Sequence, residues 1–89
     1  KSFVVHGNYP NPFNPCTQIR FRLNEPMQVR IDIYNILGKA VFTLEDREFA
    51  KGEHSARWAP TVTIPGGIYL AVLKMGETAT AKLKLVYTK

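Results

Sequence analysis

The segment NYPNPFNP, from Asn8 to Pro15, restricts the fold more than any other part of this chain. Its prolines, Pro10, Pro12 and Pro15, each fix their own φ and lack a backbone N–H. Each residue before a proline is also driven into extended or polyproline geometry. The segment therefore cannot lie inside a helix or a central strand, and we predict a stiff, extended connector.

This connector carries two aromatic rings, Tyr9 and Phe13, between its prolines. We expect both rings to pack onto the body of the protein. The side chains of Asn8, Asn11 and Asn14 can then bond backbone groups that lack a strand partner. A chain that opens in this way and continues through short alternating strands has the organisation of a small β-module and not of an enzyme.

Length and composition indicate one small folded domain, residues 1–89. A domain of this size buries somewhat over ~60% of its unfolded surface, enough for one thin core. Its hydrophobic fraction of 45% is ordinary for a globular chain. The net charge of +5 bears on solubility and partners and not on the fold.

The single cysteine, Cys16, excludes an internal disulfide, so packing must supply the stability. The chain has no initiator methionine, no signal peptide and no apolar run long enough to cross a membrane. We expect an excerpt from the C-terminal end of a longer polypeptide.

Apolar and polar residues alternate with a period of two in successive segments, which predicts strands. The expected strands cover residues 3–5, 17–23, 27–34, 40–44, 54–58, 68–74 and 78–87. About seven strands at a spacing of about 8–12 residues favour an all-β sandwich of the immunoglobulin or fibronectin type III class. Spacing alone leaves the strand order open.

The connections between these strands are also predictable. Residues 35–39 form a tight turn in which Gly38 takes positive φ. Val41 and Leu44 are spaced by three, which indicates a β-bulge. Residues 46–52 are expected to form a charged loop. The shared phase of the inward residues predicts a core of Ile19, Phe21, Val29, Ile31, Ile33, Trp58, Tyr69, Ala71, Leu73, Leu83 and Leu85.

No constellation for catalysis or metal binding emerges from the sequence. His6 and His54 fall on different strands without further ligands at suitable spacing, whereas a metal site needs three or four donors. Ser2, Ser55 and Cys16 lack an evident base. The acids that could form a catalytic pair fall together in the expected charged loop: Glu45, Asp46 and Glu48. We expect no enzyme activity and no cofactor.

Nucleic-acid binding and carbohydrate binding are two functions that the exposed side chains of such a module could serve. Arg20 and Arg22 share one strand and Arg30 lies on the next. If these two strands belong to opposite sheets, the basic groups face opposite sides of the molecule and form no nucleic-acid platform. Carbohydrate binding is the better alternative, since five rings are available: Tyr9, Tyr34, Trp58, Tyr69 and Tyr87. Trp58 and Tyr69 fall in phase with the buried sets, however. A carbohydrate-binding or structural accessory module of a secreted hydrolase stays the alternative.

Several motifs together resemble the C-terminal sorting domains of the type IX secretion system (type A, or Por secretion tails). Structural motifs that carry the resemblance are Tyr9, Pro10, Asn11, Pro12, Phe13, Asn14, Pro15, Tyr34, Asn35, Gly38 and Trp58. Motifs similar to the family's sorting signal are Pro65, Gly66, Gly67, Tyr69, Gly76, Lys82, Leu83, Lys84 and Leu85. The pattern is also similar to the immunoglobulin-like domain of the flagellar hook-capping protein. Ala59 and Pro60 depart from the Asp-Gly that commonly follows the family's tryptophan, and Gly66 stands where many members have serine.

The resemblance implies a signal and not a catalyst. Such domains follow a cargo domain in proteins of Bacteroidota-type bacteria. They direct it from the periplasm across the outer membrane to the medium or the cell surface. The implied partners are the outer-membrane secretion machinery and a sortase that can remove the domain and attach the cargo to the surface. We expect a monomer whose last strand offers an edge for strand addition.

Overall fold

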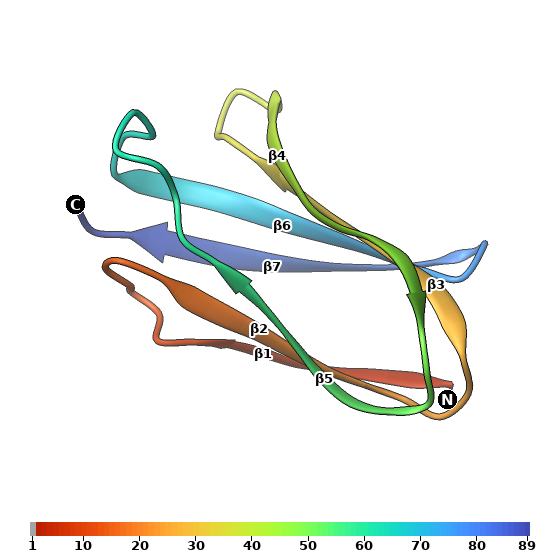
Figure 1. Cartoon of the computed structure of the whole chain (residues 1–89). Helices are drawn as coiled ribbons and strands as arrows, with labels where there is room; N and C mark the ends of the chain where they lie inside the picture. The colour runs from red at the N-terminus through yellow and green to blue at the C-terminus, as the bar shows by residue number, and fades with distance from the viewer. Residues whose placement is uncertain (1) are drawn as a thin grey trace.

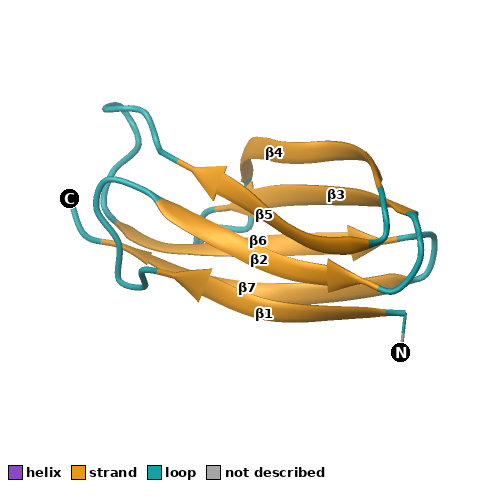
Figure 2. Ribbon diagram, turned by 60° about the horizontal axis from the view of Figure 1, so that its bottom comes forward, coloured by secondary structure: helices purple, strands orange, loops and turns teal. Residues whose placement is uncertain are grey.

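Two antiparallel sheets pack face to face and enclose one core (Figures 1 and 2). The computed structural model describes residues 2–89, so Lys1 of the expected domain lies outside the described residues. The strands are β1 (Phe3–Tyr9), β2 (Thr17–Leu23), β3 (Met27–Tyr34), β4 (Ala40–Phe49), β5 (Gly52–Trp58), β6 (Gly67–Met75) and β7 (Ala79–Tyr87). The predicted all-β sandwich is therefore confirmed.

The strand order, which the sequence left open, is β1-β2-β5 in one sheet and β4-β3-β6-β7 in the other. Three hairpins, β1–β2, β3–β4 and β6–β7, stay within a sheet, and the remaining connections cross between sheets. In a constant-type immunoglobulin domain the fourth strand joins the sheet of the first two. Here β4 pairs with β3 instead, which leaves β4 and β7 as the edges of the larger sheet.

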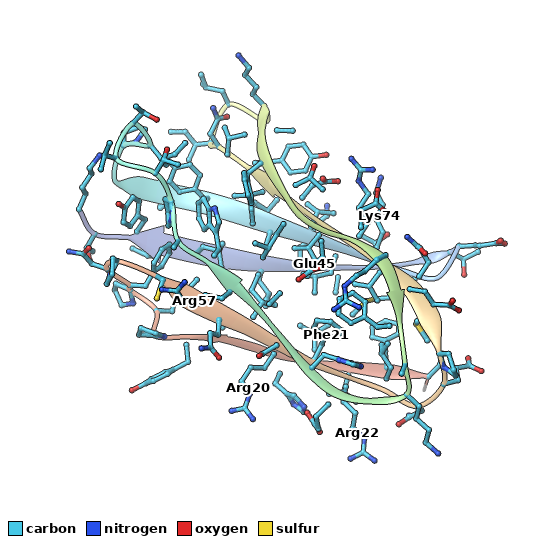
Figure 3. The ribbon with its side chains drawn as sticks, viewed as in Figure 1. Arg20, Phe21, Arg22, Glu45, Arg57 and Lys74 are labelled. Carbon is cyan, nitrogen blue, oxygen red and sulfur yellow. The ribbon has the colours of Figure 1, made fainter. Side chains whose placement is uncertain are left out.

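Period-two alternation explains which side chains fill the space between the sheets. In β2, Ile19, Phe21 and Leu23 are buried while the residues between them are exposed. Figure 3 shows Phe21 pointing between the layers and Arg20 pointing away from them. The predicted core is confirmed except for Leu83, which is half-buried against it. Buried residues that the prediction omitted are Phe13, Thr17, Leu23, Asp32, Phe49, Ala56, Met75 and Tyr87.

Four strands are longer than predicted: β5 and β6 by two residues each, and β1 and β4 by four or five. The first strand continues past Val5 to Tyr9, with an irregularity in its register beside Gly7. It is an edge strand, so it can run into the proline segment, which a central strand could not do. The fourth strand continues to Phe49, so the expected loop at 46–52 is wrong and only a short turn precedes Gly52.

The predicted bulge in β4 is confirmed, and a second one accompanies it. The register with β3 skips Leu44 between Thr43 and Glu45, and it skips Val41 between Ala40 and Phe42. Each extra residue shifts the phase of the strand, so apolar and polar positions stop alternating. Glu45, Asp46 and Glu48 consequently lie on an edge strand and not in one loop.

The hairpin between β3 and β4 is closed by Asn35 and Gly38. The Asn35 Oδ1 accepts hydrogen bonds from the backbone N–H groups of Leu37 and Lys39, both at 3.0 Å. Gly38 has a φ of +82°, which confirms the predicted positive φ. The turn carries Ile36 and Leu37 into solvent, where they are 77% and 87% exposed.

Candidate functional site

The β6–β7 hairpin contains every residue of the predicted sorting signal except Pro65 and Gly66, which lead into it. Its register pairs Gly67 with Tyr87, Tyr69 with Leu85, and Val72 with Lys82. The structure therefore brings the segment around Tyr69 and the segment around Lys84 side by side.

Three glycines shape the two ends of this hairpin. A Cβ added at Gly66 would meet Lys89 and the Tyr87 carbonyl at 3.1 Å, so the chain passes close to the end of β7 there. Gly67 has a φ of +149°, and Gly76, in the β6–β7 turn, has a φ of +67°. L side chains rarely adopt such values, so glycine is required by the backbone at these turns.

Tyr69 is a buried anchor of the hairpin. Its ring is 5% exposed and lies edge-on to Trp58, with 5.5 Å between ring centroids. Its hydroxyl donates a hydrogen bond to the Pro65 carbonyl. Burial raises the pKa of the Tyr69 phenol, which keeps it a neutral donor. Tyr69 therefore fixes the start of β6 onto the core.

Lys82 and Lys84 point away from the core, as predicted. Both are exposed, whereas Leu85 is fully buried and Leu83 is half-buried on the opposite face. No ion pair involves either lysine among residues 2–89. The last strand therefore holds the sheet through its leucines and presents its two cations on the outer surface.

The proline connector seals part of the outer edge of β7. The Asn11 Oδ1 accepts from the Val86 N–H at 2.9 Å, and its Nδ2 donates to the Lys84 carbonyl at 3.1 Å. The Phe13 N–H donates to the Val86 carbonyl at 2.9 Å, and the Thr88 N–H donates to the Phe13 carbonyl at 3.0 Å. Asn11 and Phe13 thus act as a short added strand.

An aromatic cluster locks this seal to the core. The Phe13 ring is 2% exposed and stacks on Tyr87 with 5.1 Å between centroids. It also contacts the Trp58 ring at 5.8 Å. Tyr9 behaves otherwise: it is 79% exposed, so the expectation that both rings pack down is wrong for Tyr9. Residues of an edge strand alternate between faces, and Tyr9 falls on the outer one.

A polar network lies on the outer face of the larger sheet, around Asp32. Asp32 points away from the core, yet it is only 5% exposed because its neighbours on this face cover it. Its carboxylate accepts from Arg30 Nε and from Thr43 Oγ1, each at 2.8 Å, and Arg30 also contacts Asp46 at 3.1 Å. Burial raises the pKa of Asp32, but these hydrogen bonds and the positive charges of Arg30 and Lys74 outweigh burial and leave the pKa below its usual value.

The two histidines considered for metal binding have different partners. His6 Nε2 lies 3.2 Å from Glu53, while His54 Nε2 lies 2.7 Å from the Ala50 carbonyl. No group of three or more metal-ligating side chains occurs within residues 2–89. His54 packs on Phe21 and Phe49 at the edge of the core.

The rings and the arginines fail to form the alternative binding surfaces. Trp58, Tyr69 and Tyr87 are buried, which leaves Tyr9 as the exposed ring of the five candidates, with Tyr34 half-buried. Arg20 and Arg22 lie on the smaller sheet and Arg30 on the larger one, as expected, and Figure 3 shows the first two pointing away from the molecule. No helix among the described residues could cross a membrane.

Comparison with known families identifies this β-sandwich as a sorting domain and not a catalyst. Residues 8–88 match the secretion system C-terminal sorting domain (Por secretion tail), so the chain belongs to this family. It is a non-catalytic C-terminal sorting domain for type IX secretion, and it takes its cargo across the outer membrane through the secretion machinery. No curated protein matches the chain.

Proposed function

We propose that the β6–β7 hairpin is the part of this domain that the outer-membrane secretion machinery reads. The observation that carries the proposal is the pair Lys82 and Lys84. Both are exposed and form no ion pair with any residue that the structure describes, on a strand whose leucines pack against the core. Exposed charges on a rigid strand fix the orientation of a partner and speed its encounter. The hairpin thus combines a backbone that is held in place by the core with two charged side chains that a partner can reach.

The residues of the proposed signal divide into two groups. The frame consists of residues that shape or anchor the hairpin: Pro65, Gly66, Gly67, Tyr69, Gly76, Leu83 and Leu85. The contact group is Lys82 and Lys84, together with the outer edge of β7 that the proline connector leaves open. Loss of the frame would abolish sorting through misfolding, whereas loss of the contacts would abolish recognition alone.

The wider route follows from the family. We propose that residues 1–89 act as one monomeric domain that follows its cargo. They pass through the periplasm and reach the medium or the cell surface, where a sortase can remove them. Neither a cofactor nor nucleic acid has a part in this route.

The test separates recognition from folding. We fuse the domain to an exported reporter in a bacterium that has the secretion system, and we replace Lys82 and Lys84 with alanine. The variant should unfold at nearly the same temperature as the parent while most of the reporter stays in the periplasm. Arg20→Ala with Arg22→Ala, two exposed cations at the same spacing on the other sheet, is the matched control. Equal release of the lysine variant and the parent would contradict the proposal.

A further inference from the structure

An apolar groove lies on the outer face of the larger sheet, beside the β3–β4 turn. Its volume is about 510 Å³, within the range of about 300–1,000 Å³ typical of ligand sites. Its apolar walls are Tyr34, Ile36, Ile68, Leu70 and Val72. Lys82 and Lys84 line its side along β7. Because Ile36 is 77% and Ile68 47% exposed, this face presents unusual apolar surface.

Strand pairing explains how the groove forms. Leu70 stands between Tyr34 on β3 and Lys84 on β7, and Val72 stands opposite Lys82. Directly opposed residues in an antiparallel sheet share a face, with their Cβ atoms about 4.5–5.5 Å apart. The floor is therefore apolar at Tyr34, Leu70 and Val72, with Asp32 beside Val72 on β3, and the rim along β7 is cationic.

The charges of this rim are not neutralised within the domain. Neither lysine forms an ion pair among residues 2–89. Two acids on the same face already have partners: Asp32 accepts from Arg30 and Thr43, and Asp46 accepts from Arg30 and Gln28. An occupant of the groove is thus favoured if it carries negative charge beside an apolar group.

The open edge of β7 has few free backbone groups with which a partner strand could pair. The seal formed by Asn11 and Phe13 occupies the Lys84 carbonyl and both backbone groups of Val86. The backbone groups of the even-numbered residues of β7 point toward this free edge of the sheet. Thr80 and Lys82 are therefore the positions left for strand addition. The groove is therefore the larger surface next to the two lysines.

The spacing of the lysines indicates what kind of chain fits. Residues two apart on a strand have Cα atoms about 6.6–6.8 Å apart, and side chains on alternate residues of an extended peptide repeat at the same distance. We propose that the groove binds an extended segment of a partner protein that carries an aliphatic side chain and, on the same face, two carboxylates at alternate positions over Lys82 and Lys84. This inference rests on the proposed function, because the partner would belong to the secretion machinery.

A pair of isomeric peptides tests the fit. The probe is acetyl-Ser-Leu-Ser-Glu-Ser-Glu-Ser-amide, and its control, acetyl-Ser-Leu-Ser-Glu-Glu-Ser-Ser-amide, has the same charge with the carboxylates adjacent. We expect the probe to shift the backbone amide resonances of Leu70, Val72, Lys82 and Lys84 and to bind several-fold more tightly than the control. Equal affinity for both peptides, or shifts that map elsewhere, would overturn the proposal.

Variants of the groove separate the apolar contribution from charge. Ile36→Ser with Ile68→Ser should weaken probe binding by about tenfold, because aliphatic surface that the peptide would cover is removed. Val4→Ser with Val62→Ser changes two exposed aliphatic residues outside the groove and should leave binding intact. Thermal unfolding of each variant checks that the fold is retained. Unchanged affinity in the groove variant would refute an apolar contact there.

Other occupants are outcomes of the same set of measurements. Binding to phosphatidylglycerol vesicles without binding to the peptide would identify a membrane surface and overturn the proposal. Self-association through this face in sedimentation equilibrium would identify a second copy of the domain as the occupant and would also overturn the proposal.

In the reporter assay, release of the Ile36→Ser, Ile68→Ser fusion at the parent level refutes this inference and leaves the sorting role standing. Failure of the intact fusion to leave the periplasm contradicts the sorting role. The peptide titration then decides by itself whether the groove binds an extended acidic segment.

Discussion

At the scale of single residues, the side chain of Asn11 forms hydrogen bonds to β7 that a neighbouring strand would otherwise form. Its side-chain amide bonds both a backbone N–H and a carbonyl of β7, at 2.9 and 3.1 Å. We expect Asn11→Ala to destabilise the domain by about 1–2 kcal/mol, the loss expected for one or two net hydrogen bonds. Asn14→Ala, at an exposed position in the same connector, should stay within about 0.5 kcal/mol. Urea denaturation measures both. Equal effects would show that Asn11 does not seal β7.

Asp32 predicts a pH dependence of stability. Its pKa in the folded domain lies below the ordinary value of 3.8, so the folded state binds its proton less readily than the unfolded state. The resulting stability is fully present above pH 3.8 and is lost as the pH falls through the lower, folded pKa. We expect Asp32→Asn to be less stable than the parent at neutral pH, with the difference narrowing below about pH 4. A constant difference from pH 7 to pH 2.5 in urea titrations would contradict this account, and Glu25→Gln controls for the lost charge.

Cys16 is the residue for which we predict the least effect. It is half-buried between the connector and β2 and has no cysteine partner. Cys16→Ser should shift the unfolding free energy by no more than about 0.5 kcal/mol, as for a small side chain outside the core. A much larger loss in thermal or urea unfolding would mean that the thiol packs more tightly than its exposure indicates.

At the scale of elements, the proline connector and β7 form one unit through Phe13. The ring is 2% exposed and stacks on Tyr87, while its backbone bonds both Val86 and Thr88. We expect Phe13→Ala to cost about 3–5 kcal/mol, as for other buried aromatic rings. Val62→Ala, in an exposed loop, is the control. A loss below about 1 kcal/mol in urea unfolding would place the ring outside the cooperative core.

The sequence predicted the elements best where the period of two was unbroken. β2 and β3 have the predicted bounds, since Ile19 to Leu23 and Val29 to Ile33 alternate cleanly. The end of β4 was missed because its bulges shift the phase and place charges where apolar residues would be expected. Phe49 was lost from the predicted core for the same reason.

The candidate site was predictable only in part. The sequence placed Lys82 and Lys84 outward and Tyr69 inward, because neighbouring positions on one strand decide this. The groove could not be foreseen, since it depends on the turn at Ile36 meeting Ile68 of a distant strand. The seal over β7 was foreseen only as a general need of the asparagines for backbone partners. Its bonds join residues that are 73 or 75 positions apart in the chain.

At the scale of the whole molecule, the last strand belongs to the core as well as to the proposed signal. Leu85 is fully buried and Tyr87 is 6% exposed, so deleting residues 76–89 would open the sandwich. Such a truncation should trap a reporter in the periplasm, but unfolding alone could produce this result. The alanine pair at Lys82 and Lys84 leaves the core closed and is the better variant.

We expect this folded domain to be sufficient to direct a cargo through the type IX system. The most direct measurement is the extracellular fraction of an exported reporter fused to the intact domain, in a strain with the secretion system and in a matched strain that lacks it. We predict that the reporter leaves the cell in the first strain and accumulates in the periplasm in the second. Equal extracellular fractions in the two strains, whether high or low, would contradict the account.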